Sequence, residues 1–256
     1  LLLLLLKLLA HILSPQTHAT MAAAAVAASR SRYLITGANR GIGLVLAKSL
    51  HAAGHEVVAA CRKSSEELAG LGVSKIIEGI DVSKASVGSA LVDNLAGEAA
   101  FDVVMNVAGV LSREGLDSLD FERIQLQFAV NAVGPLRVTD ALLKGGFVAD
   151  NSKLVFVTSR MGSIGDNGSG GMYGYRASKA ALNAFCKSLA VDMSKRESPS
   201  GVTVGILHPG MVATDMTGGR GIPVQESVDG LLKRVAELDS SRSGRFFHAN
   251  GEVLPW

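Results

Sequence analysis

The chain has 256 residues, of which 48% are hydrophobic and 19% are charged, and it contains 29 glycines. This composition is typical of a globular, glycine-rich α/β protein and excludes a disordered or collagen-like chain. The formal net charge is +2, but no acid precedes Glu56, so the body from Tyr33 to Trp256 carries 22 bases and 23 acids. Such a balance argues against a protein that binds nucleic acid.

The first thirty residues differ in composition from the rest. Residues 1–13 are mostly leucine, but Lys7 and His11 interrupt a run shorter than the roughly 20 apolar residues of a membrane span. Met21 then opens a stretch rich in Ala, Ser and Arg and free of acids, as organelle transit peptides are. We expect residues 1–30 to lie outside the fold, either as a targeting leader or, if translation starts at Met21, with residues 1–20 upstream of the true start.

The folded part is therefore expected to be one domain over residues 31–256, with no membrane span. Its cysteines, Cys61 and Cys186, lack metal-type spacing, so no metal site is predicted, and their number fits a reducing compartment. A cytoplasmic location is expected, with a plastid or mitochondrion as the alternative.

Short apolar runs alternate with longer amphipathic stretches throughout the body. Strands are predicted at residues 32–36, 55–60, 73–80, 102–107, 153–158, 202–207 and 245–248. Helices are predicted near residues 41–53, 84–97, 119–144, 173–195 and 225–239. Because continuous apolar strands separated by helices indicate a parallel sheet buried on both faces, the sequence predicts a doubly wound α/β domain with about seven strands.

A glycine-rich turn joins the first predicted strand to the first predicted helix. Glycines there permit a tight turn and the close approach of a pyrophosphate, which binds at a helix N-terminus where free N–H groups and the dipole favour an anion. This placement between strand and helix predicts a dinucleotide site. The turn contributes Gly37, Asn39, Arg40, Gly41, Ile42 and Gly43.

The end of the second strand indicates which dinucleotide binds. An acid is expected there in an NAD(H) site, to bind the adenosine ribose hydroxyls. Here Arg62 and Lys63 follow the strand, and Arg40 adds a second positive charge from the turn. Because a planar guanidinium matches a phosphate, the sequence favours the 2′-phosphate of NADP(H). The alternative is that Arg62 and Lys63 are ordinary solvated charges.

Asp81 and Val82 follow the third predicted strand, a position from which a side chain can reach the adenine edge. Asp81 alternatively caps a helix that begins near Lys84. The two roles are compatible, and both residues are predicted to bind the cofactor.

Tyr175 and Lys179 are four residues apart, so on a helix they lie on one face. A tyrosine with its ordinary pKa of about 10 is a poor base near neutral pH. A neighbouring ammonium and an oxidised nicotinamide would both favour phenolate and lower that pKa. Tyr173 has Ala177 in the corresponding position, so the geometry selects Tyr175. Taken alone, a packed tyrosine beside a surface lysine is the commoner arrangement.

The motifs occur in a definite order along the chain. The glycine-rich turn is followed by Asn106-Val107-Ala108-Gly109, by Asn131, by Ser159 and then by the Tyr175/Lys179 pair. This order resembles that of the short-chain dehydrogenase/reductase family, and the resemblance covers essentially the whole body. It implies a single Rossmann-type domain in which Asn106, Ala108 and Gly109 contact the cofactor. The valine within that motif departs from the usual asparagine and puts one side-chain contact in doubt.

The resemblance also implies a role for each residue of the predicted catalytic set. Ser159 would polarise the substrate carbonyl, and Tyr175 would donate or accept the proton. Lys179 would hold the nicotinamide ribose and lower the pKa of Tyr175, while Asn131 would anchor a water that relays protons to Lys179. Ser159 ends a strand whose carboxyl end faces the crevice where ligands bind in such sheets.

The run after the sixth strand resembles the family's Pro-Gly turn. The backbone near Val212 would meet the nicotinamide carboxamide, and Thr214 would contact it or the pyrophosphate. His208, just before the turn, is expected to be structural, since carbonyl reduction needs only the proton of Tyr175. The predicted cofactor contacts in this run are Pro209, Gly210, Val212 and Thr214.

Two further segments narrow the resemblance. Only about eight residues separate Met216 from the next helix near Gln225, so we expect a shallow, open substrate site. Together with the motifs above, the ending GRFFHANGEVLPW resembles the sniffer-type and C-factor-like carbonyl reductases. This implies an NADPH-dependent reductase that transfers a hydride to a ketone, aldehyde or quinone.

Two alternatives remain at this point. One is an alcohol dehydrogenase that runs the reverse reaction, and the other is a slow-turnover, nucleotide-binding signalling or sensor protein. The expected partner is a small carbonyl compound rather than nucleic acid, and the resemblance implies a homodimer or homotetramer.

Overall fold

The computed structural model describes residues 30–256, and the predictions for the leader lie outside this part of the chain. The body, Arg32–Trp256, contains a seven-stranded parallel sheet in the order β3-β2-β1-β4-β5-β6-β7. The strands are β1 (Arg32–Thr36), β2 (Glu56–Ala60), β3 (Lys75–Ile77), β4 (Phe101–Asn106), β5 (Val148–Val157), β6 (Thr203–His208) and β7 (Phe246–His248). The order reverses direction after β1, as in a doubly wound fold, and this confirms the predicted class.

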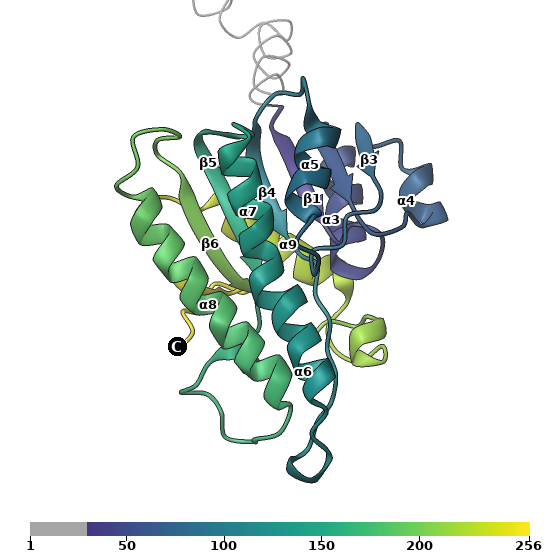
Figure 1. Cartoon of the computed structure of the whole chain (residues 1–256), viewed down its shortest axis with the longest axis vertical. Coiled ribbons are helices and arrows are strands. Elements are labelled where there is room, and N and C mark those ends of the chain that lie inside the picture. Colours follow the sequence, from purple (N-terminus) through teal and green to yellow (C-terminus); the bar gives the residue numbers. More distant parts are fainter. Residues whose placement is uncertain (1–29) are drawn as a thin grey trace, which may run out of the picture. The chain divides into compact units, whose positions relative to one another are not determined.

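Helices cover both faces of the sheet (Figure 1). Alternate residues of β1 belong to different cores, since Leu34 packs on one face and Ile35 on the other. The first face is covered by α5 (Val87–Leu95), α7 (Gly134–Lys144) and α8 (Tyr173–Met193). The second is covered by α3 (Gly41–Ala52), α4 (Glu66–Gly70) and α9 (Val224–Ala236).

The predicted helix over residues 119–144 is wrong as a single element. The structure has α6 (Phe121–Phe128), then a wide π-helical turn (Ala129–Val133), and then α7. Hydrophobic periodicity continues through this region, so the sequence pattern does not reveal the one extra residue that widens the turn. Such turns are frequent at functional sites, and this one contains Asn131.

Smaller differences have local causes. Strand β3 stops at Ile77, short of the predicted residue 80, and Gly79 then has a φ of 75° in the connection that follows. Helix α4 was not predicted, because five residues are too few for a periodic pattern. It is nevertheless capped by Ser65, whose Oγ accepts from the Leu68 N–H at 3.2 Å. Within residues 30–256 no helix is both long and apolar enough to span a bilayer.

Candidate active site

The glycine-rich turn between β1 and α3 is packed too tightly for larger residues. A Cβ on Gly43 would overlap the carbonyl oxygen of Gly37, and a Cβ on Gly37 would lie 2.8 Å from Cα of Ala108. Gly37 and Gly41 also have φ values of 72° and 53°, which glycine adopts readily. The turn therefore presents bare backbone to the crevice at the start of α3.

This start of α3 fits an anion. Its N-cap residue, Arg40, makes no side-chain capping bond, and no acid lies in the first turn. The N–H groups and the positive end of the dipole are then left for a ligand. The hydroxyl of Thr36 accepts from the Val107 N–H at 3.2 Å, which fixes the turn after β4 beside the glycine-rich turn.

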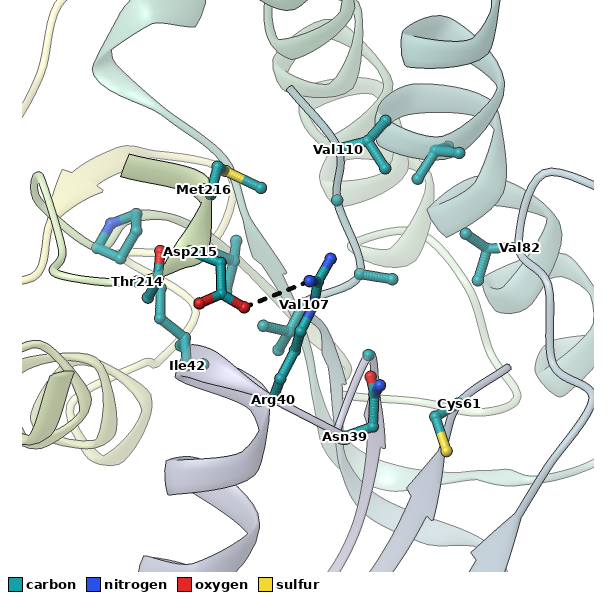
Figure 2. A pocket seen from close by; sticks show the side chains of 18 of the residues that line it. Asn39, Arg40, Ile42, Cys61, Val82, Val107, Val110, Thr214, Asp215 and Met216 are labelled. Atoms are coloured by element: carbon teal, nitrogen blue, oxygen red, sulfur yellow. Dashed lines mark hydrogen bonds and ion pairs between the residues drawn. The ribbon is translucent and has the colours of Figure 1, made fainter. Parts of the chain in front are cut away.

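A cavity of about 410 Å³ opens at the carboxyl ends of β1, β2, β4, β5 and β6. Figure 2 shows side chains that line it. This is where ligands bind in doubly wound sheets. Most of the predicted cofactor residues line it. They are Gly37, Asn39, Arg40, Gly41, Ile42, Gly43, Arg62, Asp81, Val82, Ala108, Gly109, Tyr175, Lys179, Pro209 and Thr214.

Other predicted residues lie outside this lining. Among residues 30–256, the lining of the cavity does not include Asn106, Asn131, Ser159, Gly210 or Val212. Asn106 is 3% exposed, and neither atom of its side-chain amide has a partner within the described residues. Asn106 therefore directly precedes the lining residue Val107 and keeps an unpaired amide, and its contact with the cofactor stays a prediction.

The lining also contains residues that the sequence reasoning missed. Most of them directly follow or precede predicted residues at strand ends, so extending each motif by a residue or two would have found them. Asp215 and Met216, which follow Thr214 directly, are examples. The missed residues are Cys61, Ile80, Val107, Val110, Val130, Val157, Thr158, Ala213, Asp215, Met216 and Val224.

Arg40 and Asp215 meet across the cavity from opposite sides. Nη1 of Arg40 lies 3.4 Å from Oδ2 of Asp215, and both side chains are largely exposed (Figure 2). Thr214 approaches the same turn, since a Cβ on Gly41 would lie 3.4 Å from its Cγ2. The segment after β6 therefore faces the glycine-rich turn, and the contact of Thr214 with the cofactor stays a prediction.

Asp81 shapes a turn rather than capping α5. Its Oδ1 accepts from the Ser83 N–H at 3.0 Å and from the Ser83 hydroxyl at 2.7 Å, whereas α5 begins only at Val87. Partial burial raises the pKa of Asp81, but the hydrogen bonds from Ser83 and the nearby charges of Arg62 and Lys84 bring it below its ordinary value. The carboxylate is ionised at neutral pH and lies in the electrostatic field of Arg62.

Ser159, Tyr175 and Lys179 converge beside this cavity. All three are buried, with 7%, 8% and 4% of their surfaces exposed. Tyr175 and Lys179 come from consecutive turns of α8, and Nζ of Lys179 lies 6.0 Å from the Tyr175 ring centroid. Ser159 follows β5 and forms a side-chain hydrogen bond with Tyr175. Lys179 donates to the carbonyl oxygen of Val157 at 2.9 Å.

Burial dominates the titration of this group. It raises the pKa of Tyr175 above the ordinary value, and the hydrogen bond with Ser159 opposes this only in part. Burial also lowers the pKa of Lys179 to about 8. Burial therefore favours the protonated phenol of Tyr175, and the lowering of its pKa by Lys179 together with an oxidised nicotinamide stays a prediction.

Asn131 links the turn after β4 to α8. Its amide nitrogen donates to the Val110 carbonyl at 2.8 Å and to the Ser178 hydroxyl at 3.1 Å, and its oxygen accepts from the Val110 N–H at 2.8 Å. Ser178 in turn donates to the carbonyl oxygen of Tyr175 at 2.9 Å. This side chain is thus committed to protein partners, and the role in a water relay stays a prediction.

His208 packs against His248 with ring centroids 4.8 Å apart in an edge-to-face arrangement. Burial, together with the charges of His248, Arg160 and Lys179, lowers the pKa of His208 to about 3. A histidine that is neutral throughout the physiological range is a poor proton donor. The geometry thus supports the expected structural role.

The loop after Ser159 is tied to the end of the chain. Arg160 forms ion pairs with Asp166, at 3.1 Å, and with Glu252. The Gly165 N–H also donates to the carbonyl oxygen of Trp256 at 2.8 Å. The loop that follows Ser159 is thus held in place by contacts with the C-terminal segment.

Comparison with known proteins decides the family. A model of the short chain dehydrogenase family matches residues 32–222. The chain belongs to this family of oxidoreductases. A relative from Rhodococcus sp. (strain AD45), a 1-hydroxy-2-glutathionyl-2-methyl-3-butene dehydrogenase, is 39% identical over 88% of this chain and 100% of its own.

Solved structures are similar over the same region. The carbonyl reductase Sniffer of D. melanogaster has a TM-score of 0.77 and 29% identity, covering 89% of this chain and 100% of its own. A carbonyl reductase from Pseudomonas aeruginosa PAO1 in complex with NADP has a TM-score of 0.74 and 31% identity, with the same two coverages. The likeness to Sniffer agrees with the resemblance found in the sequence motifs.

Proposed function

We propose that this family member is an NADP(H)-dependent carbonyl reductase that acts on a ketone, aldehyde or quinone. The observation that carries the proposal is the convergence of buried Ser159, Tyr175 and Lys179 beside a cavity lined by the glycine-rich turn. The similarity to carbonyl reductases of known structure supports it.

The residues present fit a phosphorylated dinucleotide. The glycine-rich turn and the start of α3 would hold the pyrophosphate, because the glycines leave the backbone accessible and the first turn of α3 contains no acid. Arg40 and Arg62 would bind a 2′-phosphate, and Asp81 with Val82 would border the adenine. Lys179 would hold the nicotinamide ribose, and Thr214 lies opposite the turn. When bound, the reduced dinucleotide supplies the hydride.

The proton is supplied by the chain itself. The hydroxyl of Ser159 donates a hydrogen bond to the substrate oxygen, and Tyr175 transfers its phenolic proton to that oxygen as negative charge develops there. Burial keeps Tyr175 protonated at neutral pH, which is the form that a reduction consumes. Lys179, with its pKa lowered to about 8, carries a positive charge at neutral pH and stabilises the phenolate that results.

Two other functions remain as alternatives. The Rhodococcus relative is called a dehydrogenase, which favours oxidation of an alcohol by the same residues. That direction requires phenolate at the start, and burial disfavours phenolate. A slow-turnover sensor is the second alternative, and the presence of the full set Asn131, Ser159, Tyr175 and Lys179 argues against it.

The test is a screen of quinones, diketones, ketones and aldehydes with NADPH and NADH side by side. Turnover by the wild type with NADPH supports the proposal, and Tyr175→Phe should abolish it while NADPH still binds. If NADPH binds and no carbonyl compound is reduced, the sensor alternative gains. Retained turnover in Tyr175→Phe would contradict the proton transfer.

The cofactor preference has its own test. Arg62→Asp should reverse the preference from NADPH to NADH, because the new carboxylate repels the 2′-phosphate and can bind ribose hydroxyls. The measurement is the ratio of kcat/KM for the two cofactors. An unchanged ratio would show that Arg62 does not contact the phosphate.

A further inference from the structure

A buried carboxylate lies close to the start of the helix that carries Tyr175. Glu114 belongs to the connection between β4 and α6, and only 4% of its surface is exposed. Within the described residues no lysine, arginine or histidine forms an ion pair with it. An uncompensated buried charge is energetically costly. The hydrogen bonds that the Glu114 carboxylate accepts must therefore offset the cost of burying it.

Those donors come from three segments. The hydroxyl of Ser112 and the side-chain amide of Gln127, the latter at 2.6 Å, both donate to Oε1 of Glu114. Gln127 lies on α6, is 1% exposed, and also donates to the Ser112 hydroxyl at 2.7 Å while accepting from the Ser112 N–H at 3.0 Å. The third donor to Glu114 is the backbone N–H of Gly174, which reaches Oε2 at 3.4 Å.

The contact with Gly174 stands in for a missing helix cap. Helix α8 begins after Met172, which has a φ of 52° and makes no side-chain capping bond. Glu114 accepts two hydrogen bonds at this helix start. Its carbonyl oxygen accepts from the Met172 N–H at 2.8 Å, and its carboxylate accepts from the Gly174 N–H in the first turn. A carboxylate at this end also interacts favourably with the helix dipole.

Tyr175 follows Gly174 directly, so what fixes the first turn of α8 also fixes the phenol. Gly174 has no room for a side chain, since a Cβ there would lie 2.5 Å from Nε2 of Gln127. We propose that Glu114 is a positioning residue, whose carboxylate holds the first turn of α8 and thereby sets Tyr175 against Ser159. The proposal rests on the carbonyl reductase function proposed above.

The donor pattern makes Glu114→Gln a sharp test. If the new amide oxygen faces Gly174, its NH₂ faces the NH₂ of Gln127. If the amide is flipped, its NH₂ faces the Gly174 N–H instead. Either orientation sets two donors against each other, which costs a hydrogen bond in a buried network.

The double variant Glu114→Gln/Gln127→Glu restores the pairing. The amide at 114 can then donate to the carboxylate at 127 and accept from Gly174, while the carboxylate at 127 accepts from Ser112. A role in positioning predicts rescue by this exchange, whereas a requirement for charge at residue 114 itself does not. Asp117→Asn, an exposed acid three residues along the same connection, is the matched control.

We expect Glu114→Gln to lower kcat for carbonyl reduction by about tenfold or more, since small misplacements of a reacting group are costly. The Kd for NADPH should stay within about twofold, and the double variant should recover most of kcat. Assays are run well below the Tm of each variant, so that loss of folded protein does not contribute. A wild-type kcat in Glu114→Gln, or a double variant no better than the single one, would overturn the proposal.

A second readout does not depend on turnover. Amide hydrogen exchange at residues 173–176, measured by mass spectrometry, should be faster in Glu114→Gln and return toward wild type in the double variant. Unchanged exchange would refute the cap. If the wild type itself reduces no carbonyl compound, the proposed function fails, and the exchange experiment still decides whether Glu114 holds the helix.

Discussion

Arg40 and Asp215 are 175 positions apart in the sequence, yet their side chains form an ion pair of 3.4 Å at the edge of the cofactor cavity. Arg40 is also one of the two arginines proposed to bind a 2′-phosphate. The guanidinium of Arg40 can therefore pair either with Asp215 or with a bound 2′-phosphate. An acid beside a phosphate site weakens phosphate binding, because it repels the ligand and occupies the cation.

Asp215→Asn should therefore tighten NADPH binding. Exposed ion pairs contribute about 0–1 kcal/mol, so we expect the Kd for NADPH to fall by up to about fivefold, with less change for NADH. Fluorescence titration with both cofactors measures this, and the exposed Glu226→Gln serves as a control for net charge. An equal gain for both cofactors would mean that Asp215 does not act through the 2′-phosphate.

Gly43→Ala should damage both folding and cofactor binding. The added methyl group would overlap the carbonyl oxygen of Gly37, and rigid backbone cannot move aside cheaply. Overpacking of this kind costs about 1–3 kcal/mol of unfolding free energy. Chemical denaturation checks the stability. Gly70→Ala, where a Cβ meets nothing within 4 Å, should be tolerated, and equal losses in the two variants would contradict the packing argument.

Lys179→Met should stabilise the protein at neutral pH while it abolishes turnover. The folded-state pKa of Lys179 is lowered to about 8 from 10.5, so between these values the unfolded chain binds more protons than the folded protein. The free energy of unfolding of the wild type therefore rises with pH across this window, and the buried charge costs stability below it. Denaturation curves from pH 7 to 10 test this, and the advantage of the variant should shrink as pH rises. The exposed Lys187→Met on the same helix should show no such trend.

His208 should make the protein sensitive to acid. Its folded-state pKa is lowered to about 3 from 6.5, so the unfolded chain binds the extra proton between these values and stability falls as pH drops. His208→Gln should flatten this part of the stability profile and keep carbonyl reduction at pH 7, whereas exposed His51→Gln should leave the profile unchanged. Loss of turnover in His208→Gln at pH 7 would instead indicate a catalytic role.

The sequence was sufficient wherever a motif acts through local backbone. The glycine-rich turn, the doubly wound parallel sheet and the placing of Tyr175 and Lys179 on one helix face follow from periodicity and from residue spacing. What sequence could not supply are contacts between distant segments. Neither the ion pair of Arg40 with Asp215 nor the capping of α8 by Glu114 has a local signature, because both depend on how the loops meet in space.

The burial of the catalytic side chains could not be predicted from the sequence either. Lys179 and an oxidised nicotinamide are expected to lower the pKa of Tyr175, but the structure buries both side chains. Desolvation raises the pKa of Tyr175 and lowers that of Lys179, so it favours the neutral form of each. Sequence spacing shows which groups are neighbours, but it does not report how much water surrounds them.

The π-helical turn at Ala129–Val133 makes the length of this segment as important as its composition. Each residue of a helix turns the chain by about 100° and advances it by about 1.5 Å. Deleting one residue here would allow α6 and α7 to join as a regular helix. Helix α6 would then be rotated by about 100° relative to α7. Gln127 would then leave Glu114, and Asn131 could not hold both Val110 and Ser178. We therefore expect homologous proteins to tolerate amino-acid substitutions in this segment but neither insertions nor deletions.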